Sequence, residues 1–369
     1  MPDREMTRAA HLEPSARHDG SVEPAHVLVL APNWLGDAVM ALPAIADVRR
    51  ACPSARLVVA ARQAVATLFQ LVPGVDDVVT LQWSGRWWQH GPFAEDVRRL
   101  RALGSGRAIL LPNSFAAAWL VKRAGISDRW GYASDMRTSL LTRSVPRPRG
   151  SLHQGGYYQH LTSTLGMTGG PLEPTLTIPT EAMASARRQL HDMGWDQVRP
   201  VVVFAPGAAY GTAKRWIPEY VARVATDLVR QRQATCVLVG SAGDTPTTRD
   251  IRTLVDRETM RHVIDLSGRT TIAELVGVLG LASACVANDS GAMHLAAAVG
   301  TPLAAIFGPT REHETAPLTR SGGRAEVLIH PVSCRPCMLR ECPIDHRCMT
   351  GITPERVYTS LVSLLSSTA

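Results

Sequence analysis

Asp37 is the first residue of the sequence whose position suggests chemistry. It lies in VLVLAPNWLGDAVMALPAI (27–45), just after an apolar run typical of a buried strand. A carboxylate at a strand end can act as a general base, which contributes about 10²- to 10⁴-fold in rate. The helical pattern of Val39, Leu42 and Ile45 that follows favours a simpler role for Asp37 as a helix N-cap. Spacing alone cannot assign the catalytic role.

A second candidate is the stretch VANDSGAMHLAAAVGTP (286–302), which predicts a strand, a tight turn and a capped helix. Asp289 and Ser290 are N-cap residue types, and Gly300 is typical of a helix C-terminus. The free amides of such a helix N-terminus bind diphosphates without a metal ion. His294, one turn into the helix, could donate to a phosphate or ribose oxygen. The structural alternative is a well-capped helix with a polar histidine.

Lys214 is the third candidate. It follows a strand and a glycine-rich turn in FAPGAAYGTAKRWIPEYV (204–221), just before a helix that begins at proline. A lysine there is a point charge suited to a phosphate group. A surface lysine is the ordinary alternative, but Lys122 and Lys214 are the only lysines in a chain that otherwise uses arginine. That choice favours a specific role for Lys214.

Four of the seven cysteines fall close together near the C-terminus, with His346 among them: Cys334, Cys337, Cys342 and Cys348. Two C-x₂-C pairs would be typical of a zinc site, and only the first pair has that spacing. Metal binding and thiols packed in a loop both remain open, and we assign no metal ligand. The other cysteines are isolated in apolar stretches, which indicates a reducing compartment.

Composition excludes several classes of protein. The 369 residues are 45% hydrophobic and 19% charged, unlike disordered or fibrous chains. The formal net charge of +7 favours an anionic partner, although like charges do not form the long runs of a nucleic-acid tail. Residues 1–24 lack the apolar core of a signal peptide, and no apolar run reaches the roughly 18 residues of a spanning helix. We therefore expect a cytoplasmic protein.

Short apolar runs alternate with amphipathic ones along the chain, which predicts two α/β lobes with parallel sheets. The expected strands are 26–31, 56–61, 77–81 and 108–112, then 201–206, 235–240, 284–289 and 303–308. The expected helices are 37–51, 63–71, 93–103 and 115–124, then 217–232, 247–260, 272–282 and 292–299. Proline and glycine are frequent over 145–200, which indicates a boundary between the lobes.

Ligands of parallel sheets bind beyond the carboxyl ends of the strands, so a cleft between two such lobes would hold the substrates. The predicted strand ends carry small, polar or charged residues: 33–37, 113–114, 207–216, 241–244, 288–294 and 308–310. The motifs GxGxxG, GxxxxGK[ST] and GxSxG do not occur at these ends. Their absence disfavours dehydrogenases, P-loop proteins and α/β-hydrolases.

Taken together, these segments resemble the family 9 glycosyltransferases, the bacterial lipopolysaccharide heptosyltransferases. The likeness extends in order over most of residues 26–360. It is carried by APNWLGDAVMALPA, LLPNSF, RAGISDRWGY, MRTSLLT, FAPGAAYGTAKRW, GSAGD, NDSGAMHLAAAVGTPLAAIFGPT and CRPCMLRECPIDHRCMTGITPERV.

The resemblance implies a GT-B fold, in which two Rossmann-like lobes face a central cleft. We expect a tail without structure, an acceptor-binding lobe, a linker with a connecting helix, a nucleotide-sugar-binding lobe and a C-terminal helix that crosses back to the first lobe. The corresponding ranges are 1–24, 25–170, 171–198, 199–350 and 351–369.

The resemblance also implies an activity. An inverting enzyme of Gram-negative bacteria would move heptose from ADP-L-glycero-D-manno-heptose to the heptosyl-Kdo2-lipid A inner core, with Asp37 as the general base. Six positions would bind the donor: Thr212, Lys214, Asp289, Ser290, Gly291 and His294. No cofactor or metal is required by this scheme. The enzyme would be a monomer that contacts the inner leaflet, where Arg86, Arg98, Arg99 and Arg101 are candidate acceptor-facing cations.

Two alternatives stay open. Another family 9 transferase would use a different donor or acceptor, such as Kdo2-lipid A without its first heptose. A basic, zinc-bearing nucleic-acid-binding protein would explain the net charge and the cysteines, but it would gather arginine, lysine and aromatic residues on one face. The sequence shows no such grouping.

Overall fold

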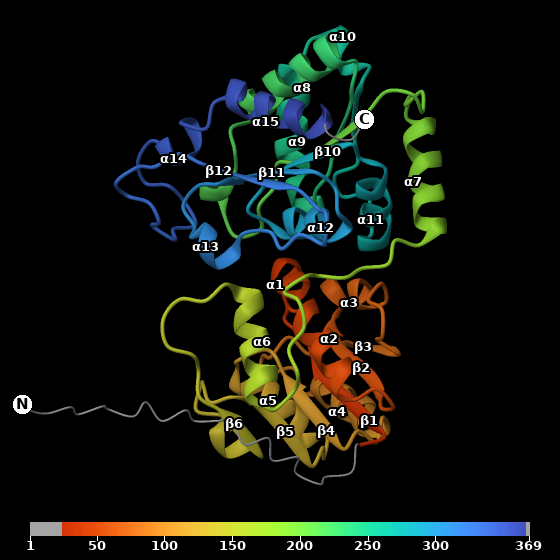
Figure 1. Ribbon diagram of the computed structural model, residues 1–369, viewed down its shortest axis with the longest axis vertical. Coiled ribbons are helices and arrows are strands. Elements are labelled where there is room, and N and C mark those ends of the chain that lie inside the picture. The colour runs from red at the N-terminus through yellow and green to blue at the C-terminus, as the bar shows by residue number, and fades with distance from the viewer. Residues whose placement is uncertain (1–23, 367–369) are drawn as a thin grey trace, which may run out of the picture.

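The computed structural model describes residues 24–366. Two α/β lobes stack along the long axis of the molecule, with the amino-terminal front lobe below the carboxyl-terminal rear lobe in Figure 1. The expected tail over 1–24 lies outside the described residues except for Pro24, as do residues 367–369. Within residues 24–366, no helix has the length and apolar character needed to cross a membrane.

The front lobe contains a parallel sheet of six strands in the order β3-β2-β1-β4-β5-β6. The central strand β1 is almost completely buried because helices cover both faces of the sheet. The strands are β1 (His26–Leu30), β2 (Arg56–Arg62), β3 (Asp77–Leu81), β4 (Arg107–Leu110), β5 (Asp128–Tyr132) and β6 (Arg143–Val145). The helices are α1 (Leu35–Met40), α2 (Leu42–Ala51), α3 (Gln63–Phe69), α4 (His90–Ala102), α5 (Phe115–Arg123) and α6 (Gln154–Thr164).

The rear lobe repeats this plan with the strand order β12-β11-β10-β7-β8-β9. Its strands are β7 (Val201–Ala205), β8 (Thr235–Leu238), β9 (Val263–Asp265), β10 (Ala284–Asn288), β11 (Leu303–Phe307) and β12 (Ala325–Ile329). Its helices are α8 (Pro218–Arg232), α9 (Thr245–Leu254), α10 (Arg257–Met260), α11 (Ile272–Leu281), α12 (Gly291–Val299), α13 (Glu312–Thr315), α14 (Arg347–Thr350) and α15 (Pro354–Ser366). Short 3₁₀ turns include η2 (Thr212–Lys214). The α/β prediction with two parallel sheets is confirmed.

The stretch 145–200 holds more helix than its turn-rich composition indicates. It contains α6, which the sequence does not predict because Gly155 and Gly156 open the helix and its apolar residues are not gathered on one side. It also contains the expected connecting helix, α7 (Thr180–Asp192). This helix packs closely on α11, since a Cβ on Gly277 would lie 2.3 Å from the carbonyl oxygen of Ala182. Helix α7 therefore belongs with the rear lobe.

The expectation that the final helix crosses back to the front lobe is wrong. Helix α15 packs on α8, β10 and β11 of the rear lobe. Its apolar face, with Val357, Leu361 and Leu364 buried, covers the rear sheet. Arg324 also donates from Nη2 to the carbonyl oxygen of Leu364 at 2.6 Å. The apolar stripe of α15 is therefore used within its own lobe.

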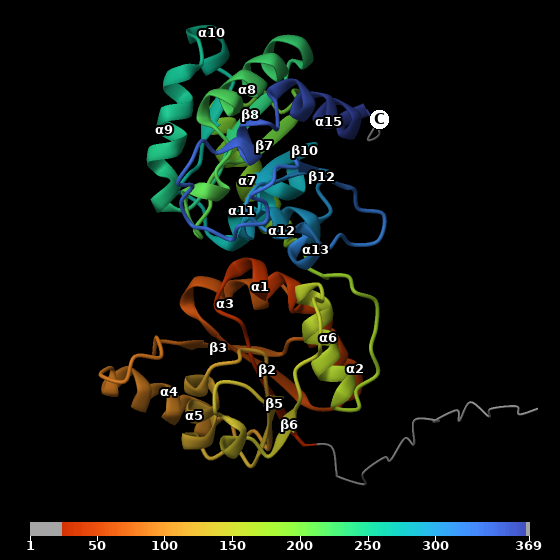
Figure 2. The ribbon, with the colours of Figure 1, turned by 90° about the vertical axis from the view of Figure 1, so that its left-hand side faces the viewer.

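The two lobes meet where α1 packs against α12 (Figures 1 and 2). Two glycines permit the close approach. A Cβ on Gly36 would lie 2.9 Å from Cδ2 of His294, and a Cβ on Gly291 would lie 2.7 Å from Cβ of Leu35. Both distances are shorter than real Cβ contacts, so any larger residue would displace its neighbour. This contact places α1 of the front lobe beside the start of α12.

A second contact between the lobes lies beside α13. Ser151 donates from Oγ to Oε1 of Glu314 at 2.7 Å. His153 accepts the Gly155 N–H at Nδ1, so its Nε2 carries the hydrogen and donates to the carbonyl oxygen of Ala316 at 2.8 Å. The segment that leads into α6 is thus tied to the rear lobe.

The helix contact predicts a stability difference between two glycine substitutions. Gly291→Ala should lower the free energy of unfolding by about 1–3 kcal/mol, because the new methyl group overlaps the Leu35 side chain at its least movable atom. Gly156→Ala is the matched control, since a Cβ there meets nothing within 4 Å. Thermal unfolding of both variants checks this, and equal melting temperatures would contradict the close packing.

Candidate active site

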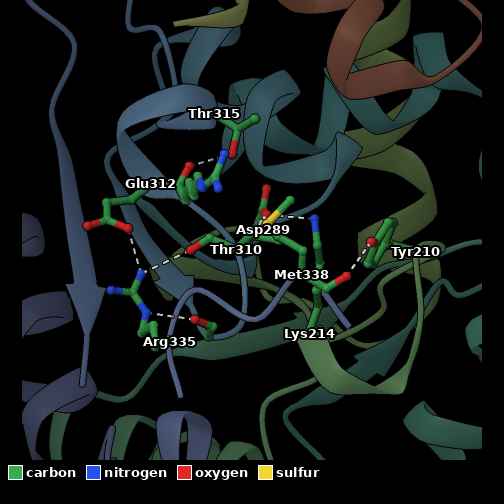
Figure 3. Close-up of polar contacts among 10 residues, drawn as sticks. Tyr210, Lys214, Asp289, Thr310, Glu312, Thr315, Arg335 and Met338 are labelled. Atoms are coloured by element: carbon green, nitrogen blue, oxygen red, sulfur yellow. Dashed lines mark hydrogen bonds and ion pairs between the residues drawn. The ribbon is translucent and has the colours of Figure 1, made fainter. Parts of the chain in front are cut away.

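Lys214 and Asp289 form a buried ion pair at the carboxyl edge of the rear sheet (Figure 3). Nζ of Lys214 lies 2.6 Å from Oδ2 of Asp289, and the side chains are only 13% and 5% exposed. Thr310 donates from Oγ1 to the same oxygen at 2.6 Å. The ammonium of Lys214 also lies 4.8 Å from the centre of the Tyr210 ring. Because an ammonium has three donors, Lys214 can bind a phosphate oxygen and keep Asp289.

The ends of β7 and β10 position this pair. Asn288, the last residue of β10, donates from Nδ2 to the carbonyl oxygen of Pro206 at 2.6 Å and accepts the Trp216 N–H at 3.2 Å. Lys214 ends the 3₁₀ turn η2 just before Trp216, whose buried ring donates to the carbonyl oxygen of Ile352. The turn is therefore held at both ends, which limits where Lys214 can reach.

The N-terminus of α12 has free amides, as predicted, but for a different reason. Ser290 is at the N-cap position, yet neither it nor Asp289 caps the helix through its side chain. The carboxylate of Asp289 is already bound by Lys214 and Thr310, and the buried hydroxyl of Ser290 has no partner in the described part of the chain. Unsatisfied amides at a helix N-terminus form an anion-binding site. The prediction of side-chain caps at these two positions is wrong.

His294 lies almost fully buried between the lobes, against Gly36. Its burial lowers the imidazole pKa to about 4, nearby Asp289 opposes this shift, and the positive charge of Lys214 acts in the same direction as burial. The ring is therefore neutral near pH 7. Its Nδ1 is buried without a hydrogen-bond partner among the described residues. A neutral imidazole with a free ring nitrogen can bind a hydroxyl or phosphate oxygen.

Asp37 lies half-buried in the first turn of α1, on the side of the rear lobe. The N-cap role that the spacing favours for Asp37 is wrong, because the N-cap is Trp34, three residues earlier, and Asp37 lies inside the first turn. Burial raises the pKa of the Asp37 carboxyl, nearby Lys214 lowers it, and nearby Asp289 raises it further. The front-lobe carboxylate thus shares one electrostatic environment with the rear-lobe ion pair.

The front lobe adds polar groups that sequence analysis does not single out. Tyr158 of α6 is buried near Asp37. Burial raises the pKa of its phenol, and the neighbouring Asp37 carboxylate raises it further. Asn113 donates from Nδ2 to the hydroxyl of Tyr157 at 2.9 Å, and its buried Oδ1 has no partner in the described chain. Asn113 is among the predicted strand ends, whereas the tyrosines stand in the helix that the sequence does not reveal.

Thr212 and the candidate acceptor-facing arginines lie outside the group formed by Asp37, Lys214, Asp289 and His294. Thr212 is exposed at the start of η2. Arg98 and Arg99 pair with Glu95 on the exposed side of α4, and Arg101 donates to the carbonyl oxygen of Arg123. Three of the four candidate acceptor-facing arginines are thus committed to contacts within the front lobe.

The cysteine-rich loop supports the turn that carries Lys214. The carbonyl oxygen of Arg340 accepts the Ala213 N–H at 2.9 Å, and His346 Nε2 lies 2.8 Å from the Ala213 carbonyl oxygen. Arg335 fixes the adjoining segment through the carbonyl oxygens of Gly308 and Thr310 (Figure 3). The cysteines line one small cavity in this loop. Across residues 24–366, no three Cys, His, Asp or Glu side chains are arranged to hold a metal ion.

Two lobes whose strand ends face each other, with a carboxylate on one and free helix amides on the other, are typical of a glycosyltransferase. The chain belongs to glycosyltransferase family 9 (heptosyltransferase), whose family model matches residues 96–347.

The relatives narrow the class. The chain is 29% identical to lipopolysaccharide heptosyltransferase 2 of Salmonella typhimurium, over 92% of this chain and 98% of that protein. It matches lipopolysaccharide heptosyltransferase 1 of Pseudomonas aeruginosa at 26% identity, over 92% and 98%. The solved structure of E. coli ADP-heptose LPS heptosyltransferase II superposes with a TM-score of 0.80 at 28% identity, covering 93% of this chain and 99% of that one. The GT-B prediction is confirmed.

The raised pKa of Asp37 predicts that removing its charge does not destabilise the protein. A folded-state pKa above the ordinary value of 3.8 means that the ionised carboxylate costs folding free energy, and that this cost appears as the pH rises through the raised pKa. Asp37→Asn should therefore melt at the same or a higher temperature at pH 7, with the difference vanishing near pH 3.

Asp196→Asn is the matched control. The Asp196 carboxylate accepts the N–H groups of Val198 and Arg199, which lowers its pKa, so its ionised form stabilises the fold. This substitution should lower the melting temperature at pH 7. A lower melting temperature for Asp37→Asn as well would show that Asp37 has a structural role.

Proposed function

We propose that this enzyme transfers heptose from ADP-L-glycero-D-manno-heptose to the heptosyl-Kdo2-lipid A inner core of lipopolysaccharide. The observation that carries the proposal is the placement of Asp37 on one lobe within electrostatic reach of the Lys214–Asp289 pair on the other. A reaction between an acceptor held by the front lobe and a nucleotide sugar held by the rear lobe needs that juxtaposition. Family membership and the likeness to heptosyltransferase 2 proteins support it.

Asp37 acts as the general base in this proposal. The acceptor hydroxyl loses its proton to the Asp37 carboxylate while its oxygen forms a bond to the anomeric carbon of the heptose. The bond from that carbon to the diphosphate oxygen breaks on the opposite side, so the configuration inverts and ADP departs with the electron pair. A carboxylate with a raised pKa is a stronger base than an exposed one.

The rear lobe stabilises the departing ADP. Lys214 supplies a positive charge, and the free amides at the N-terminus of α12 point toward the same edge of the sheet. Ser290 and Gly291 contribute hydroxyl and backbone N–H groups at the start of α12, and exposed Thr212 offers its hydroxyl to the donor from the start of η2. Neutral His294 binds a donor hydroxyl or phosphate oxygen through its free ring nitrogen. These groups are in place before the charge develops, which is the condition for electrostatic catalysis.

The acceptor is an anionic glycolipid of the inner leaflet, so the enzyme works as a cytoplasmic protein at the membrane surface. The net charge of +7 favours its approach to an anionic surface. The alternative within the family is a heptosyltransferase 1. The 26% identity to the Pseudomonas protein supports this alternative.

The acceptor separates these two functions. Purified enzyme with ADP-heptose should release ADP at least about 10-fold faster with heptosyl-Kdo2-lipid A than with plain Kdo2-lipid A, because a site shaped for the heptose leaves polar groups unpaired when that sugar is missing. Coupled ADP detection measures both rates. The reverse preference would assign the chain to the first transfer step.

The general base is tested by Asp37→Asn. We expect kcat to fall by at least about 10²-fold while the Kd for ADP-heptose stays within a factor of about 3, because the amide cannot take the proton. Titration calorimetry and single-turnover kinetics measure the two quantities. Lys214→Ala is the contrasting variant, for which donor affinity, turnover or both should fall. Unchanged turnover in Asp37→Asn would remove Asp37 from the mechanism.

A further inference from the structure

The carboxyl edge of the front sheet exposes large apolar side chains. Among the described residues, every exposed tryptophan and phenylalanine lies at this edge. Trp34 follows β1 at the start of α1, and the others follow β3, β4 and β5. We call the latter set the aromatic rim: Trp87, Trp88, Phe115, Trp119 and Met136.

Three connections bring the aromatic rim together. The loop after β3 reaches α5, since a Cβ on Gly85 would lie 3.7 Å from Cβ of Ala116. The first residue of α5, Phe115, donates its N–H to Oδ2 of Asp135 at 2.5 Å, which places the loop after β5 at the same spot. The rings of Trp87 and Trp88 are 5.7 Å apart. The connections that carry the rim therefore meet at the start of α5.

The rim is held outward and is not packed. Trp87 is 77% exposed and Met136 is 90% exposed. Asp135 and Met136 both have left-handed backbones, with φ of 48° and 52°, which non-glycine residues rarely adopt. The turn is fixed by the Asp135 carboxylate, which accepts the Phe115 N–H, and by buried Arg137, but neither contact explains the exposure of the Met136 side chain. A partner that covers the side chain would account for it.

Arginine side chains lie beside two of the tryptophan rings in the aromatic rim. The guanidinium of Arg86 lies 5.5 Å from the centre of the Trp88 ring, and that of Arg123 lies 5.5 Å from the centre of the Trp119 ring. The connections at 82–89, 111–114 and 133–137 contain one acidic residue, Asp135, whose carboxylate already accepts the Phe115 N–H. The surface thus combines exposed aromatic rings with unneutralised positive charge.

We infer that the aromatic rim docks the front lobe onto an anionic phospholipid surface. Tryptophan rings and arginine side chains at the headgroup level are what the membrane interface favours, and anionic lipids attract the guanidinium groups. The inference rests on the proposed function, because the acceptor is anchored in that membrane. Asp37 lies at the same edge of the sheet, so docking through the rim brings the lipid-anchored acceptor to the base.

Vesicle flotation with the full-length enzyme tests the inference. The vesicles contain phosphatidylcholine with or without phosphatidylglycerol and no glycolipid. Wild-type enzyme should float with the anionic vesicles, and the double variant Trp87→Ser, Trp88→Ser should lose at least about 10-fold in partitioning. Arg86→Ala with Arg123→Ala should lose the preference for phosphatidylglycerol. Val198→Ser is the matched control, because Val198 is equally exposed but lies away from the rim.

Activity on two acceptors separates docking from sugar binding. The tryptophan double variant should raise KM for the acceptor embedded in vesicles and leave kcat/KM unchanged for the deacylated, water-soluble acceptor. Equal partitioning of all variants, or no flotation of the wild type, would overturn the inference. Equal loss on the deacylated acceptor would also overturn it and make the rim a sugar-binding surface. Heptose transfer by the wild type to the deacylated acceptor tests the proposed function independently of docking.

Discussion

The approach of α1 to α12 is the constraint on which the active site depends. In the proposed mechanism neither lobe has a complete set of reacting groups, because the carboxylate comes from the front lobe and the ion pair with the helix amides from the rear lobe. Gly36 and Gly291 let the two helices approach until His294 touches the opposite lobe. The electrostatic coupling of Asp37 to Lys214 and Asp289 follows from that contact. Packing and catalysis are therefore set by the same small residues.

The charge of Lys214 is balanced by Asp289, and its ammonium group can still bind a phosphate oxygen. Asp289 neutralises Lys214 inside the protein, and Thr310 satisfies the same carboxylate oxygen. Burial raises the pKa of the Asp37 carboxyl most strongly, nearby Lys214 lowers it, and nearby Asp289 raises it further. The ionised Asp37 carboxylate therefore costs folding free energy that a neutral side chain would not cost. Such a cost is common at functional sites.

Sequence patterns predict the sheets well and the contacts between elements poorly. Strands such as β1 and β10 are near-continuous apolar runs, and the polar residues after the strands include Asp37, Asn113 and Asp289. The short or polar strands β5, β6, β9 and β12 and the glycine-led helix α6 carry no such pattern. Side-chain roles at the start of α12 also depend on partners distant in the sequence, since only the fold brings Thr310 and Lys214 to Asp289. Capping rules alone therefore misassign Asp289 and Ser290.

The placement of α15 on its own lobe has an architectural consequence. Since this helix stays with the rear sheet and α7 packs on α11, the described polypeptide passes from one lobe to the other a single time, close to Pro179. Each half is an uninterrupted stretch of chain. If the front lobe binds the acceptor, as we propose, this layout makes it an exchangeable module: a new acceptor specificity could be acquired by replacing one contiguous segment of the gene while the lobe proposed to bind the nucleotide sugar is left intact.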